Sequence, residues 1–400
     1  MAVESKYMPL DGANAVSQAM RQIDPDVVAA YPITPQTAVV QNFSQYVADG
    51  IVHTEFVPVE SEHAAMSACI GSEAAGARTM TATAANGLAL MWEELYIASG
   101  MHLPIVLTVV NRALSGPLNI HCDHSDSMGA RDAGWVQIYA ETGQEAYDNT
   151  IQAVRIAEHP DLLTPVMSCQ DGFITGHGVE RVGLLPDEEV RDFVGQYAPE
   201  VSLLDTDNPT TFGAWDFTDY YFEHKREQSQ ALIDHALRVV QEVGDEYAQL
   251  SGRPQPILDA YGMDDADLAI IVLSSTAGTA RAVARQMRAK GQKVGVLKPR
   301  LYRPFPDKMI VDAIANCKAV AVLDRAISFG APQGQGPIFT DLTAALYNQG
   351  VSGLPVVDYI FGLGGRDTLP PMIESVYADL AEVAAEGDRG AMVRYLGLRE

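Results

Sequence analysis

Two carboxylates stand where a short predicted strand gives way to a predicted helix, in the segment Val57–His63. Glu60 and Glu62 lie two residues apart, and Ser61 between them is a residue type that caps helix N-termini. A helix N-terminus carries a partial positive charge, so one interpretation of the pair is purely electrostatic. The alternative is that a partly buried carboxylate transfers protons. The spacing alone leaves both interpretations open.

The turn Tyr31–Pro35 follows another predicted strand and carries a hydroxyl group. Pro32 and Pro35 restrict its backbone and leave Thr34 on a rigid loop. In an open parallel sheet, ligands bind outside the carboxyl ends of the strands, which is where this turn is expected to lie. A plain connecting turn is the alternative.

Arg112 is the sole Lys or Arg between residues 78 and 131, and it stands two residues beyond the apolar run Ile105–Val110. A guanidinium group so close to a buried strand needs a partner. The partner is either a structural Asp or the carboxylate of a substrate, which arginine holds through two parallel hydrogen bonds. Position alone favours neither.

The loop His121–Asp126 gathers two His, two Asp and one Cys within six residues. A metal site is one hypothesis. However, the spacing matches no common site, and so short a loop cannot surround one ion tetrahedrally. We therefore expect no metal, and instead a hydrogen-bonded loop in which His121, Asp123, His124 and Asp126 border a ligand or an interface.

Alternating strand-like and helix-like segments position these residues. Over the first 170 residues the alternation is typical of an α/β fold with a doubly wound parallel sheet. Its expected strands are Val27–Ala30, Glu55–Val59, Thr79–Thr83, Ile105–Val110 and Val166–Cys169. Residues 184–255 form an irregular and helical excursion that ends in a long polar helix over Glu223–Leu250. We expect residues 1–255 to form the first domain.

A second, smaller α/β domain is expected over residues 256–400. Its predicted strands are Leu268–Leu273, Lys293–Leu297, Ala319–Leu323 and Pro355–Ile360, with three crossover helices between them. The order of strands and helices again predicts a doubly wound sheet.

Composition limits the classes of partner. The formal net charge is −25, from 27 basic and 52 acidic residues. Such a surface repels phosphate groups, so we expect neither nucleic acid nor an anionic membrane as a partner. No apolar run approaches the ~20 residues of a membrane span. The four cysteines are far apart and form no C-x-x-C, which predicts reduced thiols, a cytoplasmic location and no iron–sulfur cluster on this chain.

Six motifs in order carry a resemblance to a known family. They are YPITPQT (Tyr31–Thr37), VPVESEHAAMSACIG (Val57–Gly71), NGLALMWEELYIASG (Asn86–Gly100), NRALSGPLNIHCDHSD (Asn111–Asp126), QDGFITGH (Gln170–His177) and GQKVGVLKPRLYRPFP (Gly291–Pro306). The chain resembles the α subunit of the pyruvate:ferredoxin oxidoreductase family, the thiamine-diphosphate-dependent 2-oxoacid:acceptor oxidoreductases. The resemblance covers essentially the whole chain. It implies a thiamine pyrimidine-binding domain followed by a transketolase-C-terminal-like domain.

The resemblance also implies a reaction and partners. A 2-oxoacid, usually pyruvate, would be oxidatively decarboxylated with coenzyme A to an acyl-CoA and CO₂, and ferredoxin or another acceptor would take the electrons. The chain has no G-D-G…N-N motif, so a β subunit would hold the diphosphate and Mg²⁺ of thiamine diphosphate. Iron–sulfur clusters would lie on a ferredoxin-like subunit, and a γ subunit would complete the complex.

Individual residues acquire roles from the same resemblance. Glu62 matches the family glutamate that hydrogen-bonds the aminopyrimidine ring, which makes it the implied catalytic residue. A carboxylic acid there favours the imino tautomer that takes the proton from the thiazolium carbon. Thr34 and Arg112 match positions that hold the substrate carboxylate and carbonyl oxygen, and Pro32 and Ile33 would contact the cofactor.

Three positions depart from the family pattern. Cys122 stands where Gly is usual, Asn86 where Gln is common and Trp92 where His is common. If these residues border the pocket, a bulkier 2-oxoacid such as phenylglyoxylate is an alternative substrate. Two hypotheses of other classes are a non-catalytic assembly subunit and a stand-alone metal hydrolase built on the His121–Asp126 loop.

Overall fold

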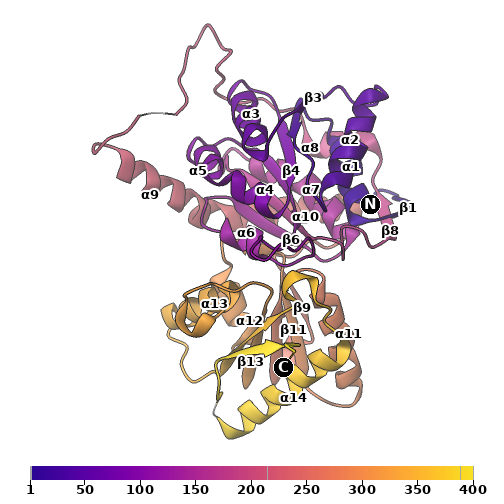
Figure 1. Ribbon diagram of the computed structural model, residues 1–400, viewed down its shortest axis with the longest axis vertical. Helices are drawn as coiled ribbons and strands as arrows, with labels where there is room; N and C mark the ends of the chain where they lie inside the picture. The colour runs from indigo at the N-terminus through magenta and orange to yellow at the C-terminus, as the bar shows by residue number, and fades with distance from the viewer. Residues whose placement is uncertain (1, 214, 388, 400) are drawn as a thin grey trace.

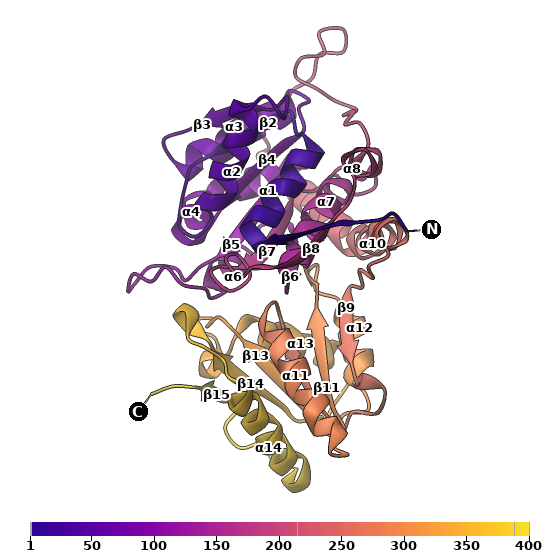
Figure 2. The same ribbon diagram turned by 90° about the vertical axis from the view of Figure 1, so that its right-hand side faces the viewer.

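The computed structural model describes residues 2–213, 215–387 and 389–399, which fold into two α/β domains placed end to end (Figures 1 and 2). Each domain is built around its own sheet, and both termini lie at the surface. Among the helices of the described residues, none is both long and apolar enough to cross a membrane.

The first domain contains a seven-stranded sheet with the strand order β12-β6-β7-β5-β4-β2-β3. Its strands are β2 (Val27–Ala30), β3 (Glu55–Pro58), β4 (Thr79–Thr83), β5 (Val106–Asn111), β6 (Val136–Ala140), β7 (Val166–Asp171) and β12 (Leu301–Arg303). Neighbouring strands are parallel, except that β12 pairs antiparallel with β6. The five expected strands are all present, whereas β6 and β12 were not expected.

Helices cover both faces of this sheet, as a doubly wound fold requires. One face packs against α1 (Gly12–Ile23), α2 (Thr37–Ala48), α7 (Gly143–Ala157), α8 (Asp187–Val194) and α10 (Leu237–Ser251). The other face packs against α3 (Glu62–Ala74), α4 (Ala85–Leu90), α5 (Trp92–Gly100) and α6 (Ser125–Gly129).

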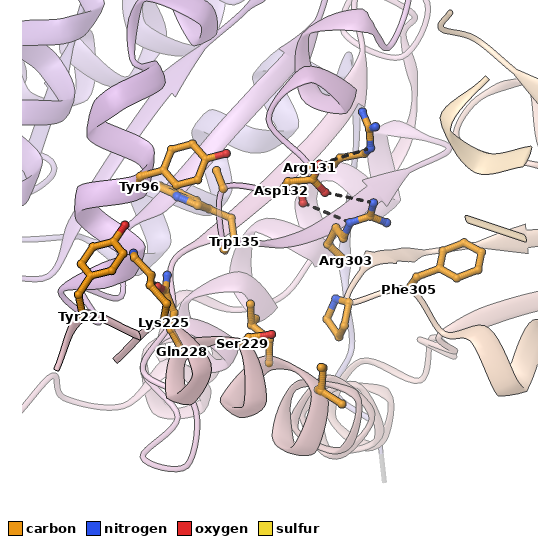
Figure 3. Close-up of a pocket in the computed structure, with 15 residues that line it drawn as sticks. Tyr96, Arg131, Asp132, Trp135, Tyr221, Lys225, Gln228, Ser229, Arg303 and Phe305 are labelled. Atoms are coloured by element: carbon orange, nitrogen blue, oxygen red, sulfur yellow. Dashed lines mark hydrogen bonds and ion pairs between the residues drawn. The ribbon is translucent and has the colours of Figure 1, made fainter. Parts of the chain in front are cut away.

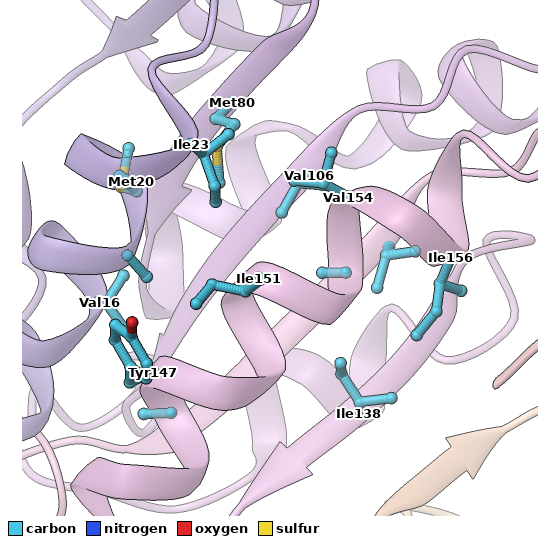
Figure 4. Close-up of a cluster of buried hydrophobic side chains, with 14 of the residues drawn as sticks. Val16, Met20, Ile23, Met80, Val106, Ile138, Tyr147, Ile151, Val154 and Ile156 are labelled. Carbon is cyan, nitrogen blue, oxygen red and sulfur yellow. The ribbon is translucent and has the colours of Figure 1, made fainter. Parts of the chain in front are cut away.

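The spacing of apolar residues explains how α1 joins the core. Val16, Met20 and Ile23 recur at helical intervals and point into one buried cluster with Ile151 of α7 and Val106 of β5 (Figure 4). The helix begins where the side chain of the preceding aspartate, at position 11, accepts a hydrogen bond from the backbone N–H three residues later, at 2.7 Å.

The second domain contains a six-stranded sheet with the order β15-β14-β13-β10-β11-β9. Its strands are β9 (Leu258–Tyr261), β10 (Leu268–Val272), β11 (Val294–Pro299), β13 (Ala319–Asp324), β14 (Val356–Phe361) and β15 (Val393–Leu396). One face packs against α11 (Thr276–Ala289) and α14 (Pro370–Glu386), the other against α12 (Asp307–Ile314) and α13 (Pro337–Asn348). Short 3₁₀ turns occupy Met263–Asp265, Pro332–Gly334 and Leu363–Gly365.

The second sheet is wider than expected. The four predicted strands are its centre, and β9 and β15 extend it at the two edges. Both edge strands are only partly buried, so they lack the apolar run that marks a central strand. Helix α14 is a fourth helix, where three were expected. Strand β12 follows β11 in sequence but completes the sheet of the first domain.

Strand β8 (Glu180–Leu184) leads into the excursion and pairs antiparallel with β1 (Lys6–Leu10). After α8 and a long irregular segment, α9 (Tyr221–Ala231) lies beside the end of α5, where His224 Nε2 is 2.9 Å from Gly100 O (Figure 1). A π-helical turn over Leu232–Ala236 leads directly into α10. The predicted helix is therefore present, but α9 has no buried residue whereas α10 packs into the core.

A polar seam joins the two domains. Lys298 on β11 is buried, and its Nζ lies 2.6 Å from Glu145 Oε1 and 3.1 Å from Glu141 Oε2 in the first domain. Arg281 on α11 makes ion pairs with Glu141 and with Asp259. The charges on the two sides are complementary, so the seam orients the second sheet against the end of the first.

Candidate functional site

Glu62 is the first residue of α3 and is 6% exposed. The helix begins there because Ser61 is extended and its Oγ accepts a hydrogen bond from the backbone N–H of Ala64, at 3.1 Å. Helix α4 passes the carboxylate at Gly87, where a Cβ would lie 2.6 Å from Glu62 Oε1. Within the described residues nothing donates a hydrogen bond to this carboxylate, so its lone pairs are available to a ligand.

The turn that carries Thr34 is fixed by the buried side chain of Gln36. Gln36 Nε2 donates to the carbonyl oxygen of Ala82 at the end of β4, at 2.8 Å, and Gln36 Oε1 accepts from Ile33 N at 3.2 Å. Thr34 and Pro32 stay at the surface. The sheet therefore holds the turn rigidly, as the two prolines predict, and presents Thr34 outward.

Arg112 is 7% exposed, and its guanidinium group contacts carbonyl oxygens. Nε donates to Asn119 O at 3.1 Å and Nη1 donates to Thr34 O at 2.8 Å. In the part of the chain that the structure describes, no carboxylate lies within ion-pair distance of it. The structural Asp that the sequence left open is therefore not found at the guanidinium, and its charge is uncompensated.

Asp126, which the sequence suggests for a possible pocket or interface, connects these pieces. Its Oδ2 accepts from the backbone N–H groups of Arg112, at 2.9 Å, and Ala85, at 3.0 Å. Its Oδ1 accepts from Asn111 Nδ2 at 2.8 Å and Ser127 N at 2.7 Å. Burial raises the pKa of Asp126 to about 6 in spite of these donors. The carboxylate therefore fastens the end of β5 to the start of α4, next to Glu62.

His124 lies at the junction of the two domains and is fully buried. Its Nε2 lies 2.7 Å from Asp171 Oδ1, at the end of β7. Asp171 Oδ2 accepts from Arg325 Nη1 of the second domain, at 3.0 Å, and from the Ser275 hydroxyl. Burial raises the pKa of Asp171, but His124 and Arg325 outweigh it and hold that pKa well below its usual range.

Cys122, His124 and Asp171 place potential metal ligands within 4.8 Å of one another. The Arg325 guanidinium already pairs with the same carboxylate, and burial raises the pKa of the Cys122 thiol well above its usual range. A divalent ion would be repelled by the guanidinium and needs a thiolate, so the donor set fits an ion-paired domain contact better than a metal centre. His121 lies outside this group.

Asp123 and His121 face the second domain instead. Asp123 Oδ2 accepts from Gly364 N at 3.1 Å. His121 is exposed, with its ring 5.1 Å from that of Phe173. The loop therefore borders an interface within the chain. Asn86 is exposed on the side of the site that carries Glu62 and Arg112, which we call the open side.

Apolar side chains are exposed on the open side of the site. Asn86 Oδ1 accepts from Ser115 N at 3.2 Å and from Ser115 Oγ at 2.8 Å, so α4 and the loop after Arg112 are linked there. Large apolar side chains are exposed on these two elements, on α5 and on the turn after β2: Leu90, Leu114, Leu118, Ile120, Trp92, Tyr96, Ile97 and Tyr31. Exposed apolar side chains that gather into one patch are typical of interaction surfaces.

Two family models match the chain. The model described as the thiamine-diphosphate-binding part of pyruvate flavodoxin/ferredoxin oxidoreductase matches residues 18–245, and the model for core domain II of pyruvate:ferredoxin oxidoreductase matches residues 266–373. The chain belongs to the pyruvate:ferredoxin oxidoreductase family. The resemblance read from the motifs is therefore confirmed.

Relatives of this family member match it over nearly their full length. It is 52% identical to pyruvate synthase subunit PorA of Thermotoga maritima, over 97% of each chain. It is 45% identical to the subunit of that name from Methanocaldococcus jannaschii, over 90% of each chain. It is also 38% identical to ketoisovalerate oxidoreductase subunit VorA of Pyrococcus abyssi, over 98% of this chain and 99% of that one.

Two solved structures support the fold of this family member. A 2-oxoglutarate:ferredoxin oxidoreductase from Magnetococcus marinus superposes with a TM-score of 0.73 at 21% identity, over 96% of this chain and 66% of that one. A split-gene transketolase superposes with a TM-score of 0.54 at 12% identity, over 95% of this chain and all of that one. The expected pyrimidine-binding domain followed by a transketolase-C-terminal-like domain is thus confirmed as a fold.

Sequence reasoning missed two charged residues of this oxidoreductase chain. Asp171 is the last residue of β7, and Arg325 directly follows β13. A charged residue at the end of a buried strand is the signal that singled out Arg112, and the same signal would have found both.

A pocket of about 730 Å³ lies apart from the candidate residues, none of which lines it (Figure 3). Tyr96 of α5 and Tyr221 and Lys225 of α9 lie on one side of it. On the other side Arg303 Nη2 lies 3.6 Å from Asp132 Oδ1. The pocket lies between α9 and the body of the first domain, and α9 buries no residue although Gln228 Nε2 donates to Ser99 Oγ at 2.9 Å.

Proposed function

We propose that this chain is the α subunit of a 2-oxoacid:ferredoxin oxidoreductase and supplies the pyrimidine-binding half of its thiamine diphosphate site. The observation that carries the proposal is the buried Glu62 carboxylate, which has no donor among the described residues and faces the bare backbone of Gly87. An unpartnered buried carboxylate is costly unless a ligand pairs with it. The match of residues 18–245 to a thiamine-diphosphate-binding model supplies that ligand class.

Glu62 would hold the aminopyrimidine ring by a carboxyl hydrogen bond, and Pro32 and Ile33 would contact the cofactor from the neighbouring turn. The fit rests on the free lone pairs of Glu62 and on the absence of a side chain at position 87. When bound, thiamine diphosphate supplies the nucleophilic carbon that attacks a 2-oxo group. The Glu62 side chain lies in the first turn of α3 and is largely buried.

Arg112 and Thr34 would bind the substrate. The Arg112 guanidinium uses one N–H on Thr34 O and one on Asn119 O, which orients it while leaving further donors free. A 2-oxoacid carboxylate would supply the missing negative charge. The Thr34 hydroxyl, on a turn held by Gln36, would donate to the substrate oxygen.

Pyruvate is the proposed substrate, with coenzyme A as acyl acceptor and acyl-CoA and CO₂ as products. The relatives named pyruvate synthase subunits support it. A branched or aromatic 2-oxoacid such as phenylglyoxylate is the second candidate, because Asn86 and Trp92 depart from the family pattern and a ketoisovalerate oxidoreductase subunit is also a relative.

The remaining functions require partners in a cytoplasmic complex. The apolar surface around Leu90 and Trp92 would be covered by a β subunit that brings the diphosphate and Mg²⁺. A ferredoxin-like subunit would hold iron–sulfur clusters, a γ subunit would complete the assembly, and ferredoxin or another carrier would accept two electrons, one at a time. In this division residues 1–255 serve the cofactor and residues 256–400 form the second domain.

Two measurements on the assembled complex test the proposal. Hydrogen–deuterium exchange at the thiazolium carbon should slow greatly in Glu62→Gln, and a turnover panel of 2-oxoacids should rank pyruvate first. Normal exchange in Glu62→Gln would leave the chain a non-catalytic assembly subunit. A panel led by phenylglyoxylate or a branched 2-oxoacid would keep the reaction class and change the substrate.

A further inference from the structure

A turn of the second domain reaches Arg112 through a single residue. Asn119 accepts a hydrogen bond from Arg112 Nε with its backbone oxygen, at 3.1 Å. Its side-chain Nδ2 donates to the carbonyl oxygen of Gly364, at 3.0 Å. The chain of contacts therefore runs from the second domain to the guanidinium in two steps, and no water or ligand is needed to complete it.

The turn Gly362–Gly365 can approach this closely because it carries almost no side chains. Gly362, Gly364 and Gly365 have φ values of +61°, +59° and +78°, a region that disfavours residues with a Cβ. A Cβ on Gly365 would clash with the Cβ of His121, and one on Gly364 would clash with the Asn119 amide. Glycine is thus required here twice, by backbone conformation and by the contact.

Further contacts tie the same loop to the second domain. Gly364 N donates to Asp123 Oδ2 at 3.1 Å, and His124 N donates to Arg325 O at 2.9 Å. The Arg325 side chain donates to Gly362 O at 3.3 Å and pairs with Asp171 in the first domain. Residues 119–124 are therefore held between the two domains at several points, while the stretch around Leu118 is exposed.

We propose that the glycine turn Gly362–Gly365 and Asn119 are positioning elements of the substrate site, which set the place of the Arg112 guanidinium from the second domain. This inference rests on the proposed role of Arg112 as the ligand of the substrate carboxylate. The loop after Arg112 has no helix or strand of its own before α6, so its shape comes from what it touches. The second domain thereby acts on substrate binding without contacting the substrate.

The test compares two glycine substitutions in the assembled complex. Gly365→Ala introduces a Cβ against His121, whereas Gly350→Ala has a similar φ of +71° but nothing within 4 Å of the new Cβ. Both variants bear the same kind of backbone strain, and the contact with His121 should lower the Tm of Gly365→Ala further than that of Gly350→Ala. Gly365→Ala alone should raise the KM for the 2-oxoacid, by roughly tenfold, the scale of one weakened charge-assisted hydrogen bond. Its kcat and its exchange at the thiazolium carbon should stay near wild type.

Asn119→Ala covers the case in which Gly365→Ala does not fold, and it should show the same rise in KM with little change in kcat. Equal KM values for the Gly365→Ala and Gly350→Ala complexes would overturn this inference and leave the proposed function standing. A wild-type KM in Asn119→Ala would do the same. Arg112→Ala separates it from the proposed function: a normal KM in that variant would overturn the substrate role of Arg112 and, with it, the positioning role of the turn.

Discussion

Two groups of buried charged side chains lie at or beyond the ends of strands, and they differ in whether they have partners within the chain. At the junction of the domains, Asp171 contacts His124, Arg325 and a serine hydroxyl, so its charge is compensated. At the open side, Glu62 has no donor and Arg112 has no carboxylate among the described residues. The charged residues and His124 are each less than a tenth exposed.

We propose that this difference separates structural charges from functional ones. A buried ion without a partner lowers the stability of the fold by several kcal/mol. Such an ion is therefore expected only where a ligand or a partner chain pairs with it. The junction is complete within the chain, and removing one of its members should disturb folding. The open side is incomplete, and removing one of its members should disturb ligand binding and catalysis with little effect on folding.

The largest effect is expected for Glu62→Gln. Glutamine is nearly isosteric but cannot supply the acidic proton, so exchange at the thiazolium carbon should fall by about 10²–10⁴-fold, the usual scale of general acid–base catalysis. The Tm should hardly change, because no intramolecular contact is lost. Glu60→Gln, two residues away and exposed, is the matched control and should exchange normally. A large fall in Tm for Glu62→Gln would place this carboxylate with the structural charges.

Asp171→Asn should produce the largest loss of stability. It leaves Arg325 buried without its carboxylate, and breaking a buried pair costs about 3–5 kcal/mol. Because the native pKa of Asp171 is lowered, its contribution is fully present above the ordinary titration range of Asp and is lost as pH falls through the native pKa. Thermal melts of wild type and variant should therefore differ most near neutral pH and converge in acid. A difference in Tm between wild type and variant that is the same at all pH values would contradict this prediction.

Arg112→Ala should lower kcat/KM by roughly 10–200-fold, since a charge-assisted hydrogen bond is worth about 1.5–3 kcal/mol. Arg112→Lys should recover only part, because an ammonium group cannot reproduce the two-pronged geometry. Steady-state kinetics and a thermal melt on the same variant distinguish a substrate-binding role of Arg112 from a structural one. A sharp fall in Tm with normal kcat/KM would return Arg112 to a structural role.

The sequence predicted the elements around the open side better than those at the junction. Most central strands were predictable because fully buried parallel strands are continuous apolar runs, as in Ile105–Val110. Strand β6 is also fully buried but was missed, because Gln137 interrupts its apolar run. The edge strands β9 and β15 were missed because they are half-exposed and have no such run. The helix starts at Ser61 and Asp11 followed from local capping, which needs no tertiary information.

Long-range pairing could not be read from local patterns. Asp126 and Asp171 are both acidic residues at strand or loop ends, yet one binds backbone N–H groups and the other an arginine 154 residues away. Only the packing of the two domains decides between these roles. The need for glycine at positions 364 and 365 was likewise not predictable, because it comes from contact with a loop of the first domain.

A third arrangement of buried charge lies inside the second domain. Asp324 accepts from Ile338 N at 3.0 Å and Phe339 N at 2.9 Å, and Asp358 accepts from Gly336 N at 2.7 Å. Among the described residues no cation pairs with either. Burial and their mutual repulsion raise the pKa of Asp324 well above its usual range, and burial raises that of Asp358 to about 6. These carboxyls cap α13 but favour the protonated form.

The smallest expected effect is on Asp358→Asn, and its pH dependence is opposite to that of Asp171→Asn. A native pKa raised above the unfolded value of about 3.9 means that stability is greatest in acid and falls as pH rises through about 6. Asparagine keeps an acceptor for Gly336 N and removes the charge. The variant should therefore gain on the order of 1–2 kcal/mol over wild type between pH 5 and 8. Asp264→Asn makes the same charge change at an exposed site and should leave the profile unaltered. Urea melts across this pH range measure the free energy of unfolding and test the prediction. If the variant loses stability with rising pH as steeply as wild type, the carboxyl pair does not control the pH dependence of stability.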